Sequence, residues 1–144
     1  MPSKHSIKDF QPKTWYHVYN RGAYKNLVYR NKQDFWVFRK MARSWIRKNP
    51  GRIKITPFAL LENHFHFKLY QENAGDMTEF MRSIGTSFGM YISKKYDHSG
   101  HVFEGIYQAI MLPDFRDQQR VRKYILSNPI EAGYLNWEHV GDYI

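Results

Sequence analysis

The sequence contains no cysteine, which excludes a disulfide framework and a thiolate metal site. It also contains no apolar run close to the roughly 20 residues that a membrane-spanning helix needs. Residues 1–11 are polar and lack the apolar stretch of a signal peptide. We therefore expect no membrane partner, and the cytoplasm is the default compartment.

Acidic residues are also scarce, because 13 Asp and Glu face 22 Lys and Arg, which gives a net charge of +9. Such a surplus attracts polyanions at long range. Nucleic acid is the commonest such partner, through phosphate neutralisation and counterion release. Aromatic residues make up 17% of the chain, and unpaired bases stack on such side chains. Together these features favour nucleic-acid binding over charge that serves solubility alone.

The length of 144 residues fits one domain, 1–144, in which residues 1–12 form a flexible arm. Alternating polarity and helical spacing then predict a series of extended segments and helices. The extended segments are Thr14–Asn20, Ile53–Leu61, His64–Gln71 and His101–Leu112, and the helices are Gln33–Lys48, Asp76–Lys95 and Asp114–Asn128. Pro129 should end the last helix, and Pro57 should interrupt its strand or place it at an edge.

The order of these elements, β-α-β-β-α-β-α, predicts an α+β fold. It suits one antiparallel sheet with helices packed on a face, as in a split βαβ arrangement.

Two histidines stand one residue apart in the segment 63–69. Because side chains alternate between the faces of a strand, His64 and His66 point one way with Lys68, while the apolar residues between them point into the core. The Cα atoms of the two histidines should lie roughly 7 Å apart, so both rings reach one divalent ion. The alternative is a pair of half-exposed histidines on a polar strand face, and the short pattern alone slightly favours it.

Tyr124 and Asn128 are spaced i and i+4 on the last predicted helix, so they share one face. An amide oxygen can complete a metal site that two histidines begin, with the tyrosine beside it as nucleophile. A phenol is a weak nucleophile at neutral pH because its pKa is about 10, and a metal that polarises the phosphate compensates in part. Core packing is the commoner role of a lone helical tyrosine, so only the combination suggests a metal-assisted phosphodiester transferase.

Four blocks of the sequence resemble the HUH-type single-tyrosine transposases, in particular the REP-associated tyrosine transposases and related insertion-sequence transposases. The blocks are Tyr16–Gly22, Asn63–His66, Ser99–Gly105 and Lys123–Gly133. Each is modest alone, but their order and spacing together are fairly specific. The resemblance covers about residues 17–133.

The resemblance implies a ferredoxin-like or RRM-like sheet with the active site on one face. It implies that His64, His66 and Asn128 bind Mg²⁺ or Mn²⁺, and that Tyr124 attacks a phosphate in single-stranded DNA beside a hairpin. The products would be a 5′-phosphotyrosine link and a free 3′-hydroxyl, ready for strand transfer without ATP. Such a protein would act as a monomer or a homodimer, in a bacterial-type cytoplasm and near the nucleoid.

The sequence departs from the family pattern at three positions that are often basic in the family. Here they are Ile106, Gln108 and Glu131. These departures weaken the inferred DNA contacts locally and leave the metal and nucleophile positions untouched.

Several further residues are candidates for DNA contacts, each with a structural alternative. They are His17, Asn20, Arg21, Lys25, Arg30, Lys94 and Lys95. A hydrogen-bonded structural role is the stronger reading for His17, and helix capping is the stronger reading for the two last lysines. We interpret His98 and His101 as loop residues near DNA.

Two other functions remain open from the sequence. One is a hairpin-specific DNA-binding regulator without catalysis, which would share the charge and the aromatic residues but would not need the Tyr124 hydroxyl. The other is an RNA-binding RRM-like domain, against which the chain lacks the usual aromatic RNP pair.

Overall fold

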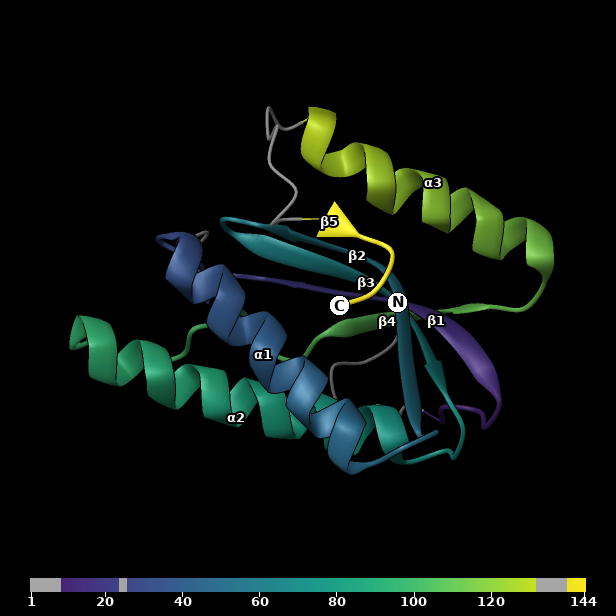
Figure 1. Cartoon of the computed structure of the whole chain (residues 1–144), viewed down its shortest axis with the longest axis horizontal. Coiled ribbons are helices and arrows are strands. Elements are labelled where there is room, and N and C mark those ends of the chain that lie inside the picture. Colours follow the sequence, from purple (N-terminus) through teal and green to yellow (C-terminus); the bar gives the residue numbers. More distant parts are fainter. Residues whose placement is uncertain (1–8, 24–25, 132–139) are drawn as a thin grey trace.

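The computed structural model describes residues 9–23, 26–131 and 140–144 (Figure 1). Its elements are β1 (Thr14–Arg21), α1 (Lys32–Lys48), β2 (Ile53–Leu61), β3 (His64–Gln71), α2 (Asp76–Tyr96), β4 (Gln108–Leu112), α3 (Phe115–Glu131) and β5 (Val140–Gly141). None of the helices in these ranges is long and apolar enough to cross a membrane.

The five strands form one sheet in the order β4-β1-β3-β2-β5, and every neighbouring pair is antiparallel. This arrangement confirms the predicted α+β fold with an antiparallel, split βαβ sheet. The pairing of β2 with β3 shifts register between Ile55 and Phe58. Pro57 lies at that shift, since proline has no N–H to give to the ladder.

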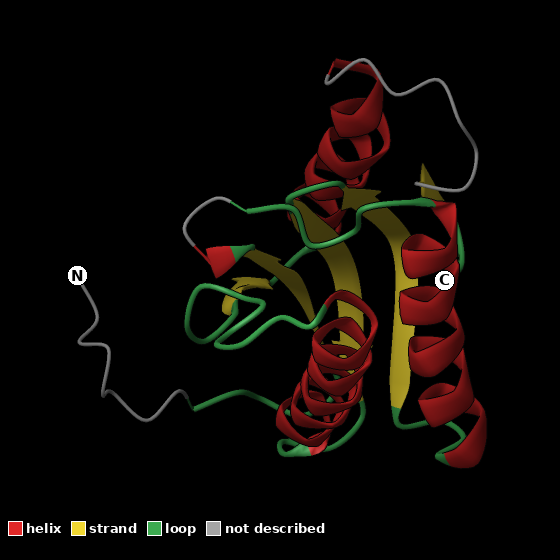
Figure 2. Cartoon of the chain, turned by 90° about the vertical axis from the view of Figure 1, so that its left-hand side faces the viewer, coloured by secondary structure: helices red, strands yellow, loops and turns green. Residues whose placement is uncertain are grey.

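Helices cover both faces of the sheet. α1 and α2 lie side by side on one face, and α3 lies on the other (Figure 1). Figure 2 shows the strands between these two helical layers. The larger apolar core is on the α1/α2 side, where Phe38, Phe67 and Phe88 are fully buried. A smaller cluster beneath α3 contains Ala59, Leu61, Leu112, Val121 and Ile125.

The chain differs from the sequence-based prediction at two places. Within 101–112, only the last five residues form a strand, and Phe103 makes a single bridge to Gly22. The turn-forming φ angles of +91° at Gly100 and +63° at Gly105 interrupt the extended run. α3 also passes through Pro129 to Glu131, although proline removes one backbone hydrogen bond and crowds the preceding turn.

The predicted N-terminal arm lies partly outside the described residues, which begin at residue 9. The ring of Phe10 packs edge-on against Tyr16 at 5.3 Å. The backbone N–H of Gln11 donates to the Tyr16 hydroxyl at 2.7 Å, and Gln71 donates to the Gln11 carbonyl at 2.9 Å. The chain is therefore held against the sheet from residue 10 onward.

Candidate active site

β3 presents His64, His66 and Lys68 on the face that α3 covers. The intervening Phe65 and Phe67 are buried in the larger core on the other face, as the alternation of the strand predicts. The rings of His64 and His66 meet edge to face with centroids 5.0 Å apart. The pleat therefore brings the two predicted metal ligands into direct contact.

The pairing of β1 with β3 adds a third imidazole to this face. Tyr19 pairs with His66 in the antiparallel register, and His17 is two residues away on the same face of β1. His17 Nε2 lies 3.0 Å from His66 Nδ1, and the two rings stack at 5.2 Å. Alternation along β1 predicts the face on which His17 lies, but only the register between the strands shows its contact with His66.

α3 brings Tyr124 over the same histidines. Its ring meets His66 edge-on at 5.5 Å and His17 at 5.8 Å. Ile125, the next residue of α3, is fully buried in the smaller apolar cluster, which fixes the helix on the sheet. Tyr124 itself is 46% exposed, so the ring faces the histidines while remaining open to a substrate.

Asn128 lies one turn beyond Tyr124 and is partly buried. Burial and, to a smaller extent, the positive charge of Arg122 lower the pKa of Lys68, and Tyr124 contacts His66. Residue numbers thus increase along α3 as they decrease along β3, so the two elements run antiparallel. The four residues from Tyr124 to Asn128 advance about 6 Å along the helix, and the two residues from His66 to His64 advance about 6.6 Å along the strand. Asn128 is therefore displaced along α3 in the same direction as His64 is displaced from His66 along β3.

The histidines of this site are held in the neutral form. Burial, together with smaller contributions from the nearby His17 and His64, lowers the pKa of His66 to about 3. Burial alone lowers the pKa of His17 to about 4 and also lowers the pKa of His64. Near pH 7 these rings have a lone pair available, as a metal ligand requires.

The Nδ1 atoms of His64 and His66 both have polar partners. His64 Nδ1 lies 2.6 Å from Asn63 Oδ1, and His66 Nδ1 contacts His17. When Nδ1 is engaged in this way, Nε2 of the same ring is the nitrogen that binds an ion. In the described part of the chain, no three His, Cys, Asp or Glu side chains form a metal-binding group. Two histidines and the amide of Asn128 make a chemically suitable donor set instead.

Two of the predicted DNA-contacting residues lie at the edge of the site and bind residues of the loop before β4. Arg21 Nε donates to a Glu104 carboxylate oxygen at 2.6 Å, and a second guanidinium nitrogen donates to the other oxygen at 3.1 Å. Asn20 donates to the carbonyl of Gly105 at 3.2 Å. Both residues therefore position this loop.

The remaining predicted DNA contacts are dispersed. Arg30 stacks over the Tyr96 ring at 4.3 Å, and Lys95 Nζ lies 2.8 Å from the buried carboxylate of Asp34. Lys25 lies outside the described residues. Lys94 is exposed and lines a cavity on α2 together with His101. These contacts give Lys95 a structural role, whereas Lys94 remains available to a partner.

Arg82 also lines this cavity, although no sequence pattern distinguishes it from other exposed cations. Helical spacing marks the apolar stripe of α2 as core, but it gives no reason to prefer one exposed cation on the opposite side. The position of Arg82 in a cavity depends on the loop 100–105, which tertiary structure alone brings to α2.

No family model matches the sequence, and no curated protein matches it. Among solved structures, a REP-associated tyrosine transposase bound to a REP hairpin matches with a TM-score of 0.73 and 16% identity, over 96% of this chain and 82% of that chain. A protein from Deinococcus radiodurans, described as a transposase, matches with a TM-score of 0.55 and 10% identity, over 94% and 99%.

The tRNA(His) guanylyltransferase of Saccharomyces cerevisiae also matches, with a TM-score of 0.52 and 11% identity, over 89% of this chain and 62% of that chain. These similarities confirm, at the level of the fold, the resemblance seen in the sequence blocks. Because the same fold occurs in an enzyme of another kind, the chemistry must be argued from the site itself.

Proposed function

We propose that this protein cuts single-stranded DNA beside hairpins and transfers the strand, with Tyr124 as the nucleophile. The observation that supports this most directly is the placement of Tyr124, edge-on to His66 at 5.5 Å and 46% exposed. The transposase-like fold and the net charge of +9 agree with a DNA substrate.

The proposed reaction is a transesterification at phosphorus. The Tyr124 phenol oxygen forms a bond to the phosphorus, the bond from phosphorus to the 3′ oxygen breaks, and the phenol proton ends on that oxygen. The products are a 5′-phosphotyrosine link and a free 3′-hydroxyl. Attack by a second 3′-hydroxyl on this link reverses the step, so strand transfer needs no ATP.

His64, His66 and Asn128 would hold a divalent ion, which would polarise the scissile phosphate and screen its charge. With an ion on His66 Nε2, the His66 Nδ1–H would donate to His17 Nε2, which lies 3.0 Å away, and this bond would hold His66 in the tautomer that the ion needs. Imidazole suits first-row transition metals better than Mg²⁺. Two histidines in the donor set therefore favour Mn²⁺ over Mg²⁺.

The first test is a covalent adduct. The protein and its Tyr124→Phe variant are incubated with hairpin oligonucleotides that have single-stranded flanks, in Mn²⁺, Mg²⁺ or EDTA, and analysed on a denaturing gel. We expect a metal-dependent protein–DNA adduct that the Tyr124→Phe variant does not form. Tyr143→Phe is the matched control, because Tyr143 is 78% exposed and has no part in the proposed site.

A second candidate is a hairpin-binding regulator without catalysis. The observation in its favour is that the described residues contain no cluster of three His or acidic metal ligands. This candidate predicts specific hairpin binding without an adduct in either metal. An adduct that persists in Tyr124→Phe would instead contradict the assignment of the nucleophile. Neither candidate depends on whether the protein is a monomer or a homodimer.

A further inference from the structure

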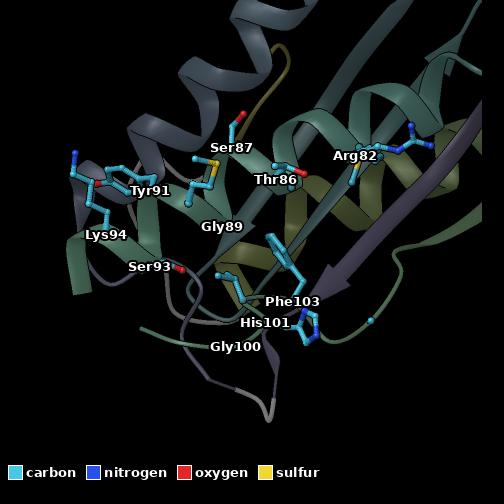
Figure 3. A pocket seen from close by; sticks show the side chains of 15 residues that line it. Arg82, Thr86, Ser87, Gly89, Tyr91, Ser93, Lys94, Gly100, His101 and Phe103 are labelled. Atoms are coloured by element: carbon cyan, nitrogen blue, oxygen red, sulfur yellow. The ribbon is translucent and has the colours of Figure 1, made fainter. Parts of the chain in front are cut away.

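A groove leads from α2 to the candidate active site. One part of it is a cavity of about 1020 Å³ between residues 81–94 of α2 and residues 100–105. Figure 3 shows Arg82 and Lys94 well apart along α2, with His101 on the loop side. A second cavity shares Arg82 and Phe103 with the first. We call these two cavities the α2 groove.

The α2 groove continues to the histidines. Its second cavity shares Asn20 and Ile106 with a third cavity of about 510 Å³, which His64 also lines. The three cavities therefore form a path along the surface, from the end of α2, past the loop before β4, to one of the proposed metal ligands.

The charge of the α2 groove is positive. Its cationic lining residues are Arg82 and Lys94, and no described residue that lines it carries a carboxylate. Arg82 and Lys94 are both exposed. At the end near the site, the Arg21–Glu104 ion pair adds no net charge, and Asn63 contributes an amide. The positive charge thus lies in the α2 groove and not in the third cavity, which His64 lines.

Arg82 and Lys94 are twelve residues apart on one helix, which separates their Cα atoms by about 18 Å. That distance equals the rise of about five base pairs of DNA at about 3.4 Å each. A short duplex stem presents phosphates at this spacing. The separation of the two cations thus fits a hairpin stem.

We propose that the α2 groove binds the sugar–phosphate backbone of the hairpin stem and that the attached strand leaves it past Ile106 to reach His64. This inference rests on the proposed function for the identity of the strand, and it adds the surface that holds the stem. Arg82 and Lys94 contact phosphates, so they contribute affinity without base specificity.

Small side chains on α2 agree with close approach of a backbone. Space beyond the Cβ positions of Gly85 and Gly89 is open, so packing within the chain does not explain these glycines. Glycine inside a helix is unfavourable relative to alanine. A larger side chain at Gly89 would project into the groove and should exclude the stem.

The test measures binding in the Tyr124→Phe background, so that cleavage does not interfere. Binding of a fluorescent hairpin with a single-stranded flank is followed by anisotropy across a salt series. We expect Arg82→Ala/Lys94→Ala to weaken binding roughly tenfold or more and to reduce the salt slope by about 2. The control is Arg43→Ala/Arg47→Ala, which removes the same charge from exposed positions of α1 outside the groove.

A second variant separates shape from charge. Gly89→Leu changes no charge and introduces a better helix former, so the fold should persist by circular dichroism while hairpin affinity falls. If Gly89→Leu leaves DNA binding intact but abolishes a dimer seen by sedimentation, the groove is instead an interface between two copies and the proposal is wrong.

The outcomes distinguish this inference from the proposed function. Equal effects of the groove and control double variants would overturn the groove assignment while leaving adduct formation unaffected. Groove-dependent hairpin binding without any adduct from the parent chain would support the groove and overturn the nicking chemistry. A parent chain that binds no hairpin overturns both.

Discussion

His17 acts on the candidate metal site through one hydrogen bond. Its Nε2 lies 3.0 Å from His66 Nδ1, and in the proposed metal site this contact would leave His66 Nε2 for the ion. Removing a hydrogen-bond partner that orients a metal-binding histidine typically lowers the affinity for the metal by about 10–100-fold. In the proposed metal site, His17 would therefore act as a positioning residue.

We predict that His17→Phe, which keeps an aromatic ring and removes the acceptor, lowers the affinity of the DNA-free protein for Mn²⁺ by about 10–100-fold. His17→Gln, which keeps an amide acceptor, should lose less. Isothermal titration with Mn²⁺ measures both. If the Phe variant binds Mn²⁺ as well as the parent does, the hydrogen bond has no role in orienting His66.

The buried histidines should also make the metal-free protein less stable in mild acid. The pKa of His66 is lowered from 6.5 to about 3 by burial, and that of His17 to about 4. Below pH 6.5 the unfolded chain therefore binds more protons than the folded chain. By linkage, the free energy of unfolding is highest above pH 6.5 and falls as the pH decreases toward these folded values.

For His66 the expected slope is about 1 kcal/mol per pH unit. Urea denaturation in EDTA, between about pH 7 and pH 5, measures it. His66→Gln should reduce the slope because no proton is then taken up at this position on unfolding. Identical slopes for the parent and the variant would show that His66 does not stay neutral in the fold.

At the scale of elements, one buried carboxylate joins the start of α1 to the end of α2. Asp34 has no exposed surface, and it accepts hydrogen bonds from Lys95 and from the Tyr91 hydroxyl, each at 2.8 Å. Burial would raise the pKa of Asp34, but the bonds from Lys95 and from its other donors outweigh burial and lower it. The carboxylate therefore remains charged and paired.

We predict that Asp34→Ala decreases the free energy of unfolding by about 3 kcal/mol, because it leaves the Lys95 ammonium and two tyrosine hydroxyls without their acceptor. Arg120→Ala is the control, since it removes an ion pair to Asp117 in which the arginine side chain is 69% exposed. That change should amount to less than about 1 kcal/mol. Chemical denaturation measures both, and equal losses would contradict the structural role of Asp34.

Sequence patterns predicted the elements best where local chemistry decided them. Ile53–Leu61 and His64–Gln71 have the predicted bounds, because apolar, strand-forming segments flank a short polar turn. The segment 101–112 was predicted as one strand, although the positive φ angle at Gly105 breaks it. β5 has only two residues, and so short a segment has no periodicity to detect.

The candidate site was predictable only in part for the same reason. Strand alternation places His64 and His66 on one face of β3, and helical spacing places Tyr124 and Asn128 on one face of α3. The contact between His17 and His66 depends on the register of β1 with β3, which no local pattern encodes. The α2 groove similarly depends on how the loop 100–105 packs against a distant helix.

At the scale of the whole molecule, the sheet separates two apolar clusters of unequal size. The larger one joins the sheet to α1 and α2. The smaller one holds α3 through Val121 and Ile125, packed on residues of β2 and β4. The helix that presents Tyr124 is therefore anchored by less buried apolar surface than the helices on the opposite face.

This asymmetry predicts a hierarchy of local stability. Segments with few buried apolar contacts open at lower free energy than the core. The amides of α3 should therefore exchange with deuterium faster, through openings of lower free energy, than those of β3 and α2. Ile125→Ala should increase this difference, because deleting a buried isoleucine side chain costs about 2–5 kcal/mol. Mass spectrometry of hydrogen exchange measures each segment separately.

If α3 opens independently, Ile125→Ala should also reduce adduct formation by Tyr124 while leaving protection in α2 unchanged, because the nucleophile is positioned by α3. Val121→Ala, at a position 8% exposed in the same cluster, should have a smaller effect, since less side chain is removed. Equal protection in α2 and α3, lost together in Ile125→Ala, would contradict the hierarchy: the two faces of the sheet would then unfold as one cooperative unit.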